Sequence, residues 1–466
     1  MIKLFLLILF SFSFFFYSCQ EDESNPANNP QTGIPSEPRN LTRLYEDSTV
    51  ILKWDTPENT GSPIMTKYLI YRNAGGSNYE NIGFTLYNTT NYRDTAAIIF
   101  ASYSYYVTAV NVDGESEKSN EVSASPYPFG TNGSVNAIAN NGNDVYIGGN
   151  FSTAGGIGVN YVAKWDGSTW SALGTGIGGS NPVVNTITTS GNDVYVGGVF
   201  TIAGGNIVNN IAKWNGTNWS SLGIGISGEV RSIVVDGNNV YVGGIISTAG
   251  GSAVNNIAKY NGTDWTPLGS GVTSAGTVYE NSIAIAGSDL YAGGRFSFAG
   301  GASASNIAKW NGTTWTALGS GLEGPSPYVY SIILIGSDVY AAGRFTSAGG
   351  VNVNNIAKWN GISWYTLGTG LTGNAADEVR SIINDGNVIY AGGTFSEAGG
   401  VSANKIAKWS GEIWFPLGSG IAGTSTLLNE LNLKGNSIYA AGIFSSAGGK
   451  NARNVAYWNG FEWKGF

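Results

Sequence analysis

Short runs in which apolar and polar residues alternate fill most of this chain, and from residue 134 onward they return in a fixed order. In one such unit, strand-length runs cover residues 184–188, 193–200, 210–214 and 219–222, with polar, Gly-containing residues between them. Alternation with a period of two is typical of half-buried β-strands. Each unit therefore predicts four short strands joined by tight turns.

The unit occurs seven times between Ser134 and Phe466. Its clearest marker is an aromatic residue directly before an Asn/Asp/Ser-Gly pair, and successive markers lie 46 to 50 residues apart. The markers are Trp165, Trp214, Tyr260, Trp310, Trp359, Trp409 and Trp458. A repeat of this length, with turn residues inside each unit, is typical of propellers and related arrays. Four antiparallel strands in each of seven units predict a seven-bladed β-propeller.

Two local features of the repeats make further predictions. Asn-Gly pairs such as Asn215-Gly216 lie between the third and fourth strands and predict hairpins with type I′ turns, which need a positive φ at both central residues. In Tyr195-Val196-Gly197-Gly198, glycine is expected to allow a Trp or Tyr of the neighbouring blade to approach closely.

Closure of the ring is predicted from the two ends of the repeat region. Residues 126–130 (Pro-Tyr-Pro-Phe-Gly) are similar to a degenerate Trp-x-x-Leu-Gly strand, and residues 463–466 end the last unit with that strand nearly complete. We expect the start of the ring to pair near its end, although proline weakens the prediction of a strand at 126–128.

The preceding segment, residues 35–126, has longer apolar alternations and no cysteine, which suits a β-sandwich without disulfides. The order of its markers resembles a fibronectin type III domain; these markers are Pro38, Trp54, Tyr68-x-x-Tyr71 and the run of residues 103–111. The resemblance implies that Trp54 is a core residue and that a tyrosine near Tyr103 forms the tyrosine corner. It also implies a spacer module, with direct binding as the alternative.

The repeats themselves resemble known propeller families. The double glycine, the spaced tyrosine and the later tryptophan are similar to kelch-type repeats of galactose oxidase-like proteins. The Trp-Asn-Gly-x-x-Trp piece resembles the propeller repeats of cortical polarity-marker proteins. These resemblances imply the all-β fold and little about activity. The copper site of galactose oxidase needs histidines and a Tyr–Cys crosslink that this chain lacks, and the Asp box of sialidase-type propellers is not matched.

Composition narrows the function classes. The chain has no histidine, which excludes His-based triads, His general bases and His-rich metal sites. We predict no cofactor, no metal site and no catalytic residue. Only 12% of the residues are charged, the formal net charge is −8, and no long basic block occurs, so we expect no nucleic-acid partner.

The N-terminus predicts export and lipidation. Lys3 precedes an apolar run of 14 residues (4–17) that is interrupted only by Ser11 and Ser13; this run is too short to span a bilayer as a helix, where about 20 residues are needed. The small residue before Cys19 resembles the lipobox of bacterial lipoproteins, which implies a signal peptide over 1–18 and a lipid on Cys19 that holds the protein at a membrane. The alternative is an ordinary signal peptide with a chance cysteine.

Residues 19–34 then predict a flexible linker that begins with the lipidated cysteine and a short acidic run, residues 20–23. This run resembles the signal that sends some Gram-negative lipoproteins to the outer face of the outer membrane. We therefore expect a protein on the cell surface, with an anchor facing the periplasm as the alternative. The sandwich over 35–126 and the propeller over 127–466 complete the predicted domain order.

Candidate ligand-binding residues are those that differ among the seven copies. They lie in the connections between blades and directly after the double glycines, which are expected on one face of the ring. The candidates are Arg231, Tyr279, Glu280, Arg295, Tyr328, Tyr330, Arg344, Glu378 and Arg380. Arginines beside tyrosines and carboxylates can hold a sugar or an acidic group. The alternative is that each arginine only pairs with a nearby glutamate.

These features favour a non-catalytic binding or adhesion protein that recognises a glycan or a protein through one face of the propeller. Two alternatives stay open. A polysaccharide-acting enzyme would need two carboxylates at a suitable separation, or Tyr with Arg, drawn from Glu229, Glu280, Glu378 and Tyr330. A structural component of an envelope complex would need neither a soluble ligand nor turnover.

Overall fold

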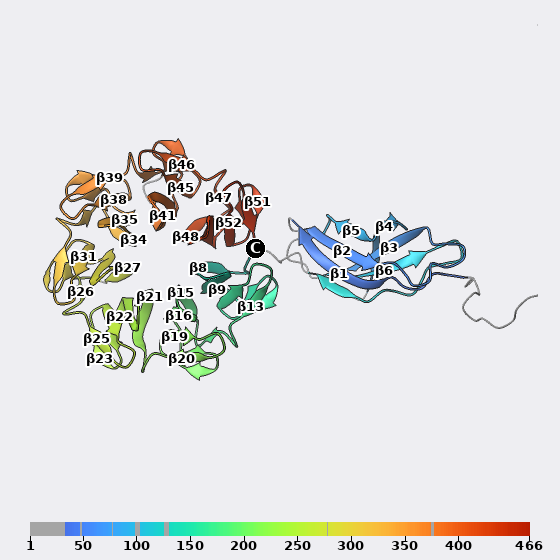
Figure 1. Ribbon diagram of the computed structural model, residues 1–466, viewed down its shortest axis with the longest axis horizontal. Helices are drawn as coiled ribbons and strands as arrows, with labels where there is room; N and C mark the ends of the chain where they lie inside the picture. Colours follow the sequence, from blue (N-terminus) through green and yellow to red (C-terminus); the bar gives the residue numbers. More distant parts are fainter. Residues whose placement is uncertain are drawn as a thin grey trace, which may run out of the picture. The chain divides into compact units, whose positions relative to one another are not determined.

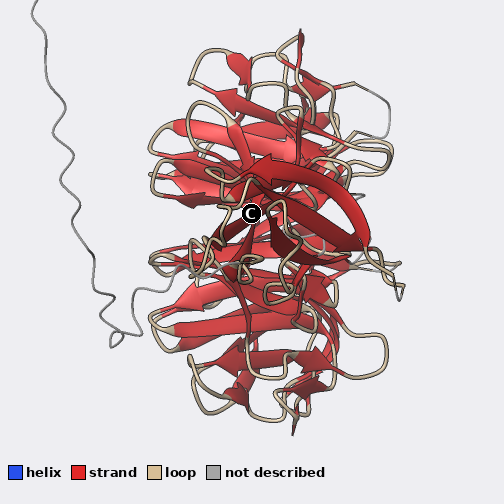
Figure 2. Cartoon of the chain, turned by 90° about the vertical axis from the view of Figure 1, so that its right-hand side faces the viewer, coloured by secondary structure: helices blue, strands red, loops and turns tan. Residues whose placement is uncertain are grey.

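The computed structural model describes residues 33–46, 49–76, 78–97, 103–124, 130–276, 278–373 and 377–466. Within these ranges the regular elements are strands, without a helix (Figure 2). The part of the chain described here accordingly holds no helix that is long and apolar enough to cross a membrane. The chain divides into two compact units, a smaller one that ends at Ala124 and a larger one that consists mainly of Ser125–Phe466. The all-β prediction is confirmed.

The smaller unit is a sandwich of two sheets. One sheet has the order β1 (Arg39–Glu46), β2 (Thr49–Asp55), β5 (Asn91–Asp94), and the other has the order β4 (Glu80–Leu86), β3 (Lys67–Asn73), β6 (Tyr103–Val110), β7 (Val122–Ala124). This is the architecture of fibronectin type III domains. Trp54 is buried in the core as predicted, with its ring centre 5.3 Å from that of Tyr68. Tyr103 is buried too, and the neighbouring buried Tyr105 donates a hydrogen bond to Asp94.

The larger unit is a ring of blades (Figure 1). Its described residues form seven sheets, each built from four consecutive main strands, and we number these blades 1 to 7 in chain order. The first strands line the centre of the ring: β8 (Ser134–Asn141), β15 (Val183–Ser190), β21 (Ile226–Asp236), β27 (Tyr279–Ala286), β34 (Tyr328–Ile335), β41 (Val379–Asp385) and β48 (Leu427–Lys434). Each first strand contacts the next, and β48 contacts β8, so the ring is closed.

The other strands of each blade follow outward. The second strands are β9 (Asp144–Asn150), β16 (Asp193–Val199), β22 (Asn239–Ala249), β28 (Asp289–Arg295), β35 (Asp338–Arg344), β42 (Val388–Gly393) and β49 (Ser437–Ile443). The third are β12 (Val162–Trp165), β19 (Ile211–Trp214), β24 (Ile257–Tyr260), β31 (Ile307–Trp310), β38 (Ile356–Trp359), β45 (Ile406–Trp409) and β52 (Val455–Trp458). The outermost are β13 (Trp170–Ala172), β20 (Trp219–Ser221), β25 (Trp265–Pro267), β32 (Trp315–Ala317), β39 (Trp364–Thr366), β46 (Trp414–Pro416) and β53 (Trp463–Gly465).

Small strand pairs that the sequence pattern did not predict tie each blade to the next. After blade 1, β14 (Ile177–Gly178) pairs with β17 (Ile202–Ala203), which pairs with β18 (Asn206–Ile207). The connection into blade 2 therefore lies against that blade's Ala-Gly-Gly loop, on the same face of the ring. Equivalent pairs occur at later connections, for example Leu322 with Ala348. The hairpin turns within the blades lie on the opposite face.

Two details of the repeats differ from the predictions. The Asn215-Gly216 hairpin forms, but Gly216 has a positive φ (97°) and Asn215 does not. The loop has four residues, and the Asn215 side-chain oxygen accepts hydrogen bonds from the amides of Thr217 and Asn218, so the type I′ prediction is wrong. A local side-chain bond to the backbone has replaced the tighter turn.

The predicted close approach of the neighbouring blade to Gly197 is observed, but the side chains that approach are aliphatic and not aromatic. A Cβ on Gly197 would lie 2.5 Å from a Val230 methyl group and 2.9 Å from one of Ile233, both in the next blade. The tryptophan meets the later glycine pair instead: a Cβ on Gly204, whose φ is 60°, would lie 2.5 Å from Trp219 of its own blade. Close packing at both positions requires the absence of a side chain.

The ring closes between blades 7 and 1 without exchange of a main strand, because all four strands of each blade come from one continuous segment. Residues 125–129, and with them most of the proposed degenerate strand, lie outside the described residues. The adjoining Thr131 pairs with Ala154, just as Ile177 pairs with Ala203 one blade later. The start of the ring thus supplies a connecting strand, and Phe466 at its end packs against Trp165 and Trp170 of blade 1.

Candidate ligand-binding mouth of the central channel

A β-bulge interrupts each of the seven described first strands at the same point, near the face that carries the connections between blades. One residue of each first strand is left without a ladder partner there, and a bulge of this kind changes the direction of a side chain. The seven bulge residues are Asn136, Asn185, Arg231, Asn281, Tyr330, Arg380 and Asn429. The bulge thus repeats around the ring while the residue type changes.

Six of these residues line one cavity of about 400 Å³, the exception being Asn281, whose side chain is outside the described part of the structure. Glu229 and Tyr328 complete its lining. The same six residues also line the central channel, a cavity of about 510 Å³ between the first strands. The smaller cavity is therefore the mouth of the channel, and we use that name for it.

Arg231 is held on one side of the mouth by a carboxylate and a ring. Its Nε lies 3.1 Å from Oε1 of Glu229, two residues earlier in β21. The guanidinium carbon lies 5.0 Å from the ring centre of Tyr279 in the next blade, close enough for a cation–π contact. Asn185 of the preceding blade donates to the same Glu229 oxygen, at 3.0 Å. These contacts orient a forked donor before any ligand arrives.

Arg380 repeats this arrangement with Glu378, again two residues earlier. Its Nε donates to Oε2 of Glu378 at 3.1 Å, and its guanidinium carbon lies 5.2 Å from the ring centre of Tyr330. The Tyr330 hydroxyl donates to the other Glu378 oxygen at 3.0 Å, and Nη1 of Arg344 lies 3.6 Å from that oxygen. Glu378 thus joins three candidate residues from two blades.

The tyrosines add a hydrogen-bond donor and an apolar ring face. Tyr330 stacks on Tyr328 with ring centres 4.8 Å apart. Burial raises the pKa of the Tyr330 phenol, and the negative charge of Glu378 raises it further. The phenol therefore keeps its proton at neutral pH and acts as a donor rather than as a base.

Asparagine amides cover the remaining side of the mouth. Asn429, Asn136 and Asn185 each donate to a main-chain carbonyl of the following blade, at 3.0, 3.1 and 3.3 Å. Nη1 of Arg380 donates to the Asn429 side-chain oxygen at 3.3 Å, which links the arginine side to the asparagine side. The mouth is consequently a belt of preoriented polar groups and not an apolar pocket.

The structure brings together most, but not all, of the residues that the sequence singled out. Arg231, Tyr328, Tyr330 and Arg380 line the mouth, and Tyr279 and Glu378 contact these lining residues. Arg344 lies farther out: it contacts Glu378 and lines an adjacent cavity of about 440 Å³. Arg295 is exposed and is not part of the mouth lining. Glu280 belongs to β27, but its side chain lies outside the described part of the structure.

Asn136, Asn185 and Asn429 were not predicted. Asparagine occurs throughout these repeats, so three more copies looked like part of the scaffold. Their position in the repeat could have identified them: each lies two residues before an aliphatic residue of the first strand, as do Arg231, Tyr330 and Arg380. The described residues include no group of three or more Asp, Glu, Cys or His side chains that could hold a metal ion.

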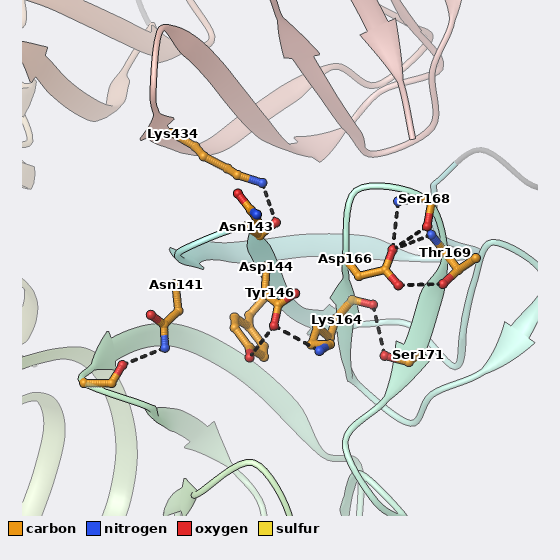
Figure 3. A network of polar contacts seen from close by, with 11 residues as sticks. Asn141, Asn143, Asp144, Tyr146, Lys164, Asp166, Ser168, Thr169, Ser171 and Lys434 are labelled. Carbon is orange, nitrogen blue, oxygen red and sulfur yellow. Dashed lines mark hydrogen bonds and ion pairs between the residues drawn. The ribbon is translucent and has the colours of Figure 1, made fainter.

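A second polar cluster lies on the opposite face, at the hairpins of blade 1 (Figure 3). Lys164 Nζ lies 2.9 Å from Asp144, beside Tyr146, at a cavity of about 600 Å³ between blades 1 and 2. The same lysine–aspartate pair recurs in blades 2, 4 and 5, where it raises the pKa of Lys213, Lys309 and Lys358. Because the pair repeats, it belongs to the shared blade structure rather than to a single site.

Comparison with known proteins supports the propeller fold of the larger unit. The family described as "Rax2 C-terminal beta propeller domain" matches residues 115–281, about a third of the chain. No curated protein matches the chain.

Solved structures resemble about a fifth of the chain. They include domains A168–A170 of titin (23% identity, 20% of this chain, 32% of that chain, TM-score 0.19). A Fn3-like protein from Clostridium thermocellum is 26% identical, and the match covers 20% of this chain and 92% of that chain with a TM-score of 0.17. A beta-1,2-glucanase from Parabacteroides distasonis is 28% identical, and the match covers 22% of this chain and 14% of that chain with a TM-score of 0.19.

Proposed function

We propose that this protein is a non-catalytic recognition scaffold that binds a glycan or a protein at the mouth of the propeller channel. The observation that carries the proposal is the shared bulge. It turns a guanidinium, a phenol or an amide toward one mouth from six blades. Such a ring of fixed donors and acceptors on a rigid fold is suited to multipoint hydrogen bonding of a polar ligand.

Binding is favoured over catalysis because Glu229 and Glu378, the carboxylates described at the mouth, are already engaged. Glu229 accepts from Arg231 and Asn185, and Glu378 accepts from Arg380 and Tyr330. A glycosidase needs one carboxylic acid that keeps its proton to protonate the leaving group. Here Glu229 and Glu378 are instead hydrogen-bonded to the guanidinium groups of Arg231 and Arg380. This arrangement supports the role of the glutamates as positioning groups for the arginines.

The remaining parts of the proposal concern the cellular localisation of the protein. A lipid on Cys19 and the acidic residues after it would hold the propeller at the outer surface of a Gram-negative outer membrane, with the fibronectin-like sandwich as a spacer. Residues 1–32 are outside the described part of the structure, so this assignment depends on the sequence alone.

The test uses the full chain in a nonionic detergent against a panel of polysaccharides and matrix proteins, with release of reducing ends followed in the same samples. Arg231→Ala and Arg380→Ala should each weaken binding about tenfold or more, since a hydrogen bond to a charged group contributes roughly 1.5–3 kcal/mol. Arg295→Ala, an exposed arginine outside the mouth, is the matched control. Turnover, or equal losses in all three variants, would contradict the proposal.

A further inference from the structure

The residue that follows each bulge also occupies one position around the ring. These residues are Ala137, Thr186, Ser232, Ser282, Ser331, Ser381 and Glu430. The four serines make the same bond between blades: each hydroxyl oxygen accepts the backbone N–H of a residue in the following blade, at 3.0 to 3.1 Å. The position therefore serves to fasten one blade to the next.

Glu430 makes this bond at the place where the ring must close. Its Oε2 accepts the backbone N–H of Ile138 at 2.7 Å, which joins blade 7 to blade 1. We call this junction the seam, and it is the one junction of the ring that the chain does not cross. A carboxyl replaces the serine hydroxyl there, so one of the bonds that close the ring belongs to a group that can gain or lose a proton.

The surroundings of Glu430 disfavour its charge. Its side chain is partly accessible from the channel, but the blades enclose it, and burial raises the pKa of its carboxyl to about 8. The Ile138 amide acts in the opposite direction and is the weaker cause. A carboxyl in this setting is largely uncharged at neutral pH.

No cation of a neighbouring strand neutralises this carboxyl. Among the strands packed on β48, the described side chains of β8, β42 and β49 include no carboxyl, lysine or arginine, and their ionisable groups are tyrosines, such as Tyr390 and Tyr439. On β41, Arg380 is held by Glu378, and Asp385 lies at the far end of the strand. On β48 itself, Lys434 donates to the Asn143 carbonyl (Figure 3).

We propose that Glu430 is a proton-controlled latch of the propeller ring, in which the uncharged carboxyl holds blade 7 against blade 1 and opening of the seam is coupled to its ionisation. In the opened seam the carboxyl would face water and titrate near the ordinary value of a glutamate. The closed seam therefore binds one more proton than the open seam between about pH 4.5 and pH 8.

The sign of the pH dependence follows from this difference. Because the closed state holds the extra proton, raising the pH through this window favours the open state, and each pH unit is equivalent to about tenfold in the opening equilibrium. Above pH 8 both states are ionised and the dependence ends. The channel ring is thus expected to be tightest in mildly acidic surroundings.

Hydrogen exchange of the full chain in detergent, followed by mass spectrometry from pH 5 to pH 9, tests the latch. After correction for the chemical exchange rate, protection of peptides from β8 and β48 should fall about tenfold per pH unit between pH 5.5 and 7.5 and level off above pH 8. Peptides from β22, remote from the seam, should show no such slope. The variant E430Q keeps a side-chain acceptor but cannot ionise, and it should abolish the slope at the seam.

The control variant is E462Q, which removes an exposed glutamate whose pKa is lowered by Lys450 and which does not face the channel. It should keep the wild-type slope. A flat profile in the wild type, or the same slope in E430Q, overturns the proposal. If E430Q does not fold, infrared difference spectroscopy of the wild-type protonated carboxyl band decides: a band that titrates near pH 8 supports the latch, and complete loss of the band by pH 6 overturns it.

Discussion

The seam differs from the six junctions that the chain crosses, although each of the seven junctions joins two blades of the same four-stranded type. At each crossed junction, the indole N–H of an outermost-strand tryptophan donates to a leucine carbonyl of the preceding blade, as Trp219 does to Leu173 at 2.7 Å and Trp414 to Leu367 at 2.9 Å. At the seam, Phe466 takes the position of that leucine. Trp170 packs on its ring, and the buried indole N–H of Trp170 has no hydrogen-bond partner among the described residues.

Other contacts at the seam take the place of the missing bond. The ring centre of Phe466 lies 5.5 to 5.6 Å from those of four aromatic residues, Trp165, Trp170, Tyr439 and Tyr457. Longer polar side chains cross the seam as well: Glu430 reaches the Ile138 amide, and Asn140 reaches the Leu433 carbonyl. At a crossed junction, the continuous chain links the two blades covalently. The unlinked junction relies on a larger aromatic cluster and on side chains that span the gap.

The largest expected difference between the two kinds of junction comes from removing the tryptophans. Trp414→Ala removes a buried ring and its bond to Leu367, and we expect a loss of about 3–5 kcal/mol in the free energy of unfolding. Trp170→Ala removes a similarly buried ring without a hydrogen bond, so its loss should be smaller by about 1 kcal/mol. Urea unfolding of both variants measures the difference.

Replacement by phenylalanine isolates the hydrogen bond from the packing. Trp414→Phe leaves the Leu367 carbonyl without its donor and should cost about 1–3 kcal/mol more than Trp170→Phe, which removes an unpaired buried N–H. Equal costs for the two phenylalanine variants would show that the tryptophan–carbonyl bond does not distinguish the junctions.

A medium effect is expected at the serine position of a crossed junction. Ser381→Ala removes the acceptor of the Leu431 amide, a bond of 3.0 Å in a buried position, and should lower the free energy of unfolding by about 1–3 kcal/mol. The loss should not depend on pH between 5 and 8, in contrast to the seam. Ser220→Ala, an exposed serine on β20, is the control and should change stability by less than about 0.5 kcal/mol.

The smallest effect is expected for the lysine–aspartate ion pairs, which lie within blades 1, 2, 4 and 5 rather than between blades. Lys213 and Asp193 lie 3.1 Å apart, with about a third of each side chain exposed. Lys213→Met should therefore cost less than about 1 kcal/mol, and the cost should shrink further at high salt. A loss as large as that of Ser381→Ala would mean that the hairpin face contributes more to the stability of the blade than its exposure indicates.

The repeat made the strands predictable with good accuracy. In blade 2, the predicted runs 184–188, 193–200, 210–214 and 219–222 correspond to β15 (Val183–Ser190), β16 (Asp193–Val199), β19 (Ile211–Trp214) and β20 (Trp219–Ser221). The short strands β14, β17 and β18 were missed, since two residues are too few to show alternation. The turn at Asn215 was mispredicted because side-chain bonding to the loop amides is not visible in residue type alone.

The candidate site was partly predictable for a related reason. Arg231, Tyr330 and Arg380 were found because they break the repeat, whereas Asn136 and Asn185 resemble the many other asparagines of the scaffold. All five share a mouth only because a bulge interrupts each first strand at the same register. Arg295 also breaks the repeat, yet it lies in a second strand and remains exposed.

The all-β class, the number and order of the repeats and the types of residue that vary among them were predictable from the sequence alone, because alternation and repetition are local properties of a chain. The tertiary structure was needed to show which variable residues meet, that Glu430 bonds across the seam, and that Trp170 lacks the bond that its counterparts make. Those facts depend on blade 7 lying beside blade 1, a contact between segments about 290 residues apart, and on the burial of Glu430 between the blades.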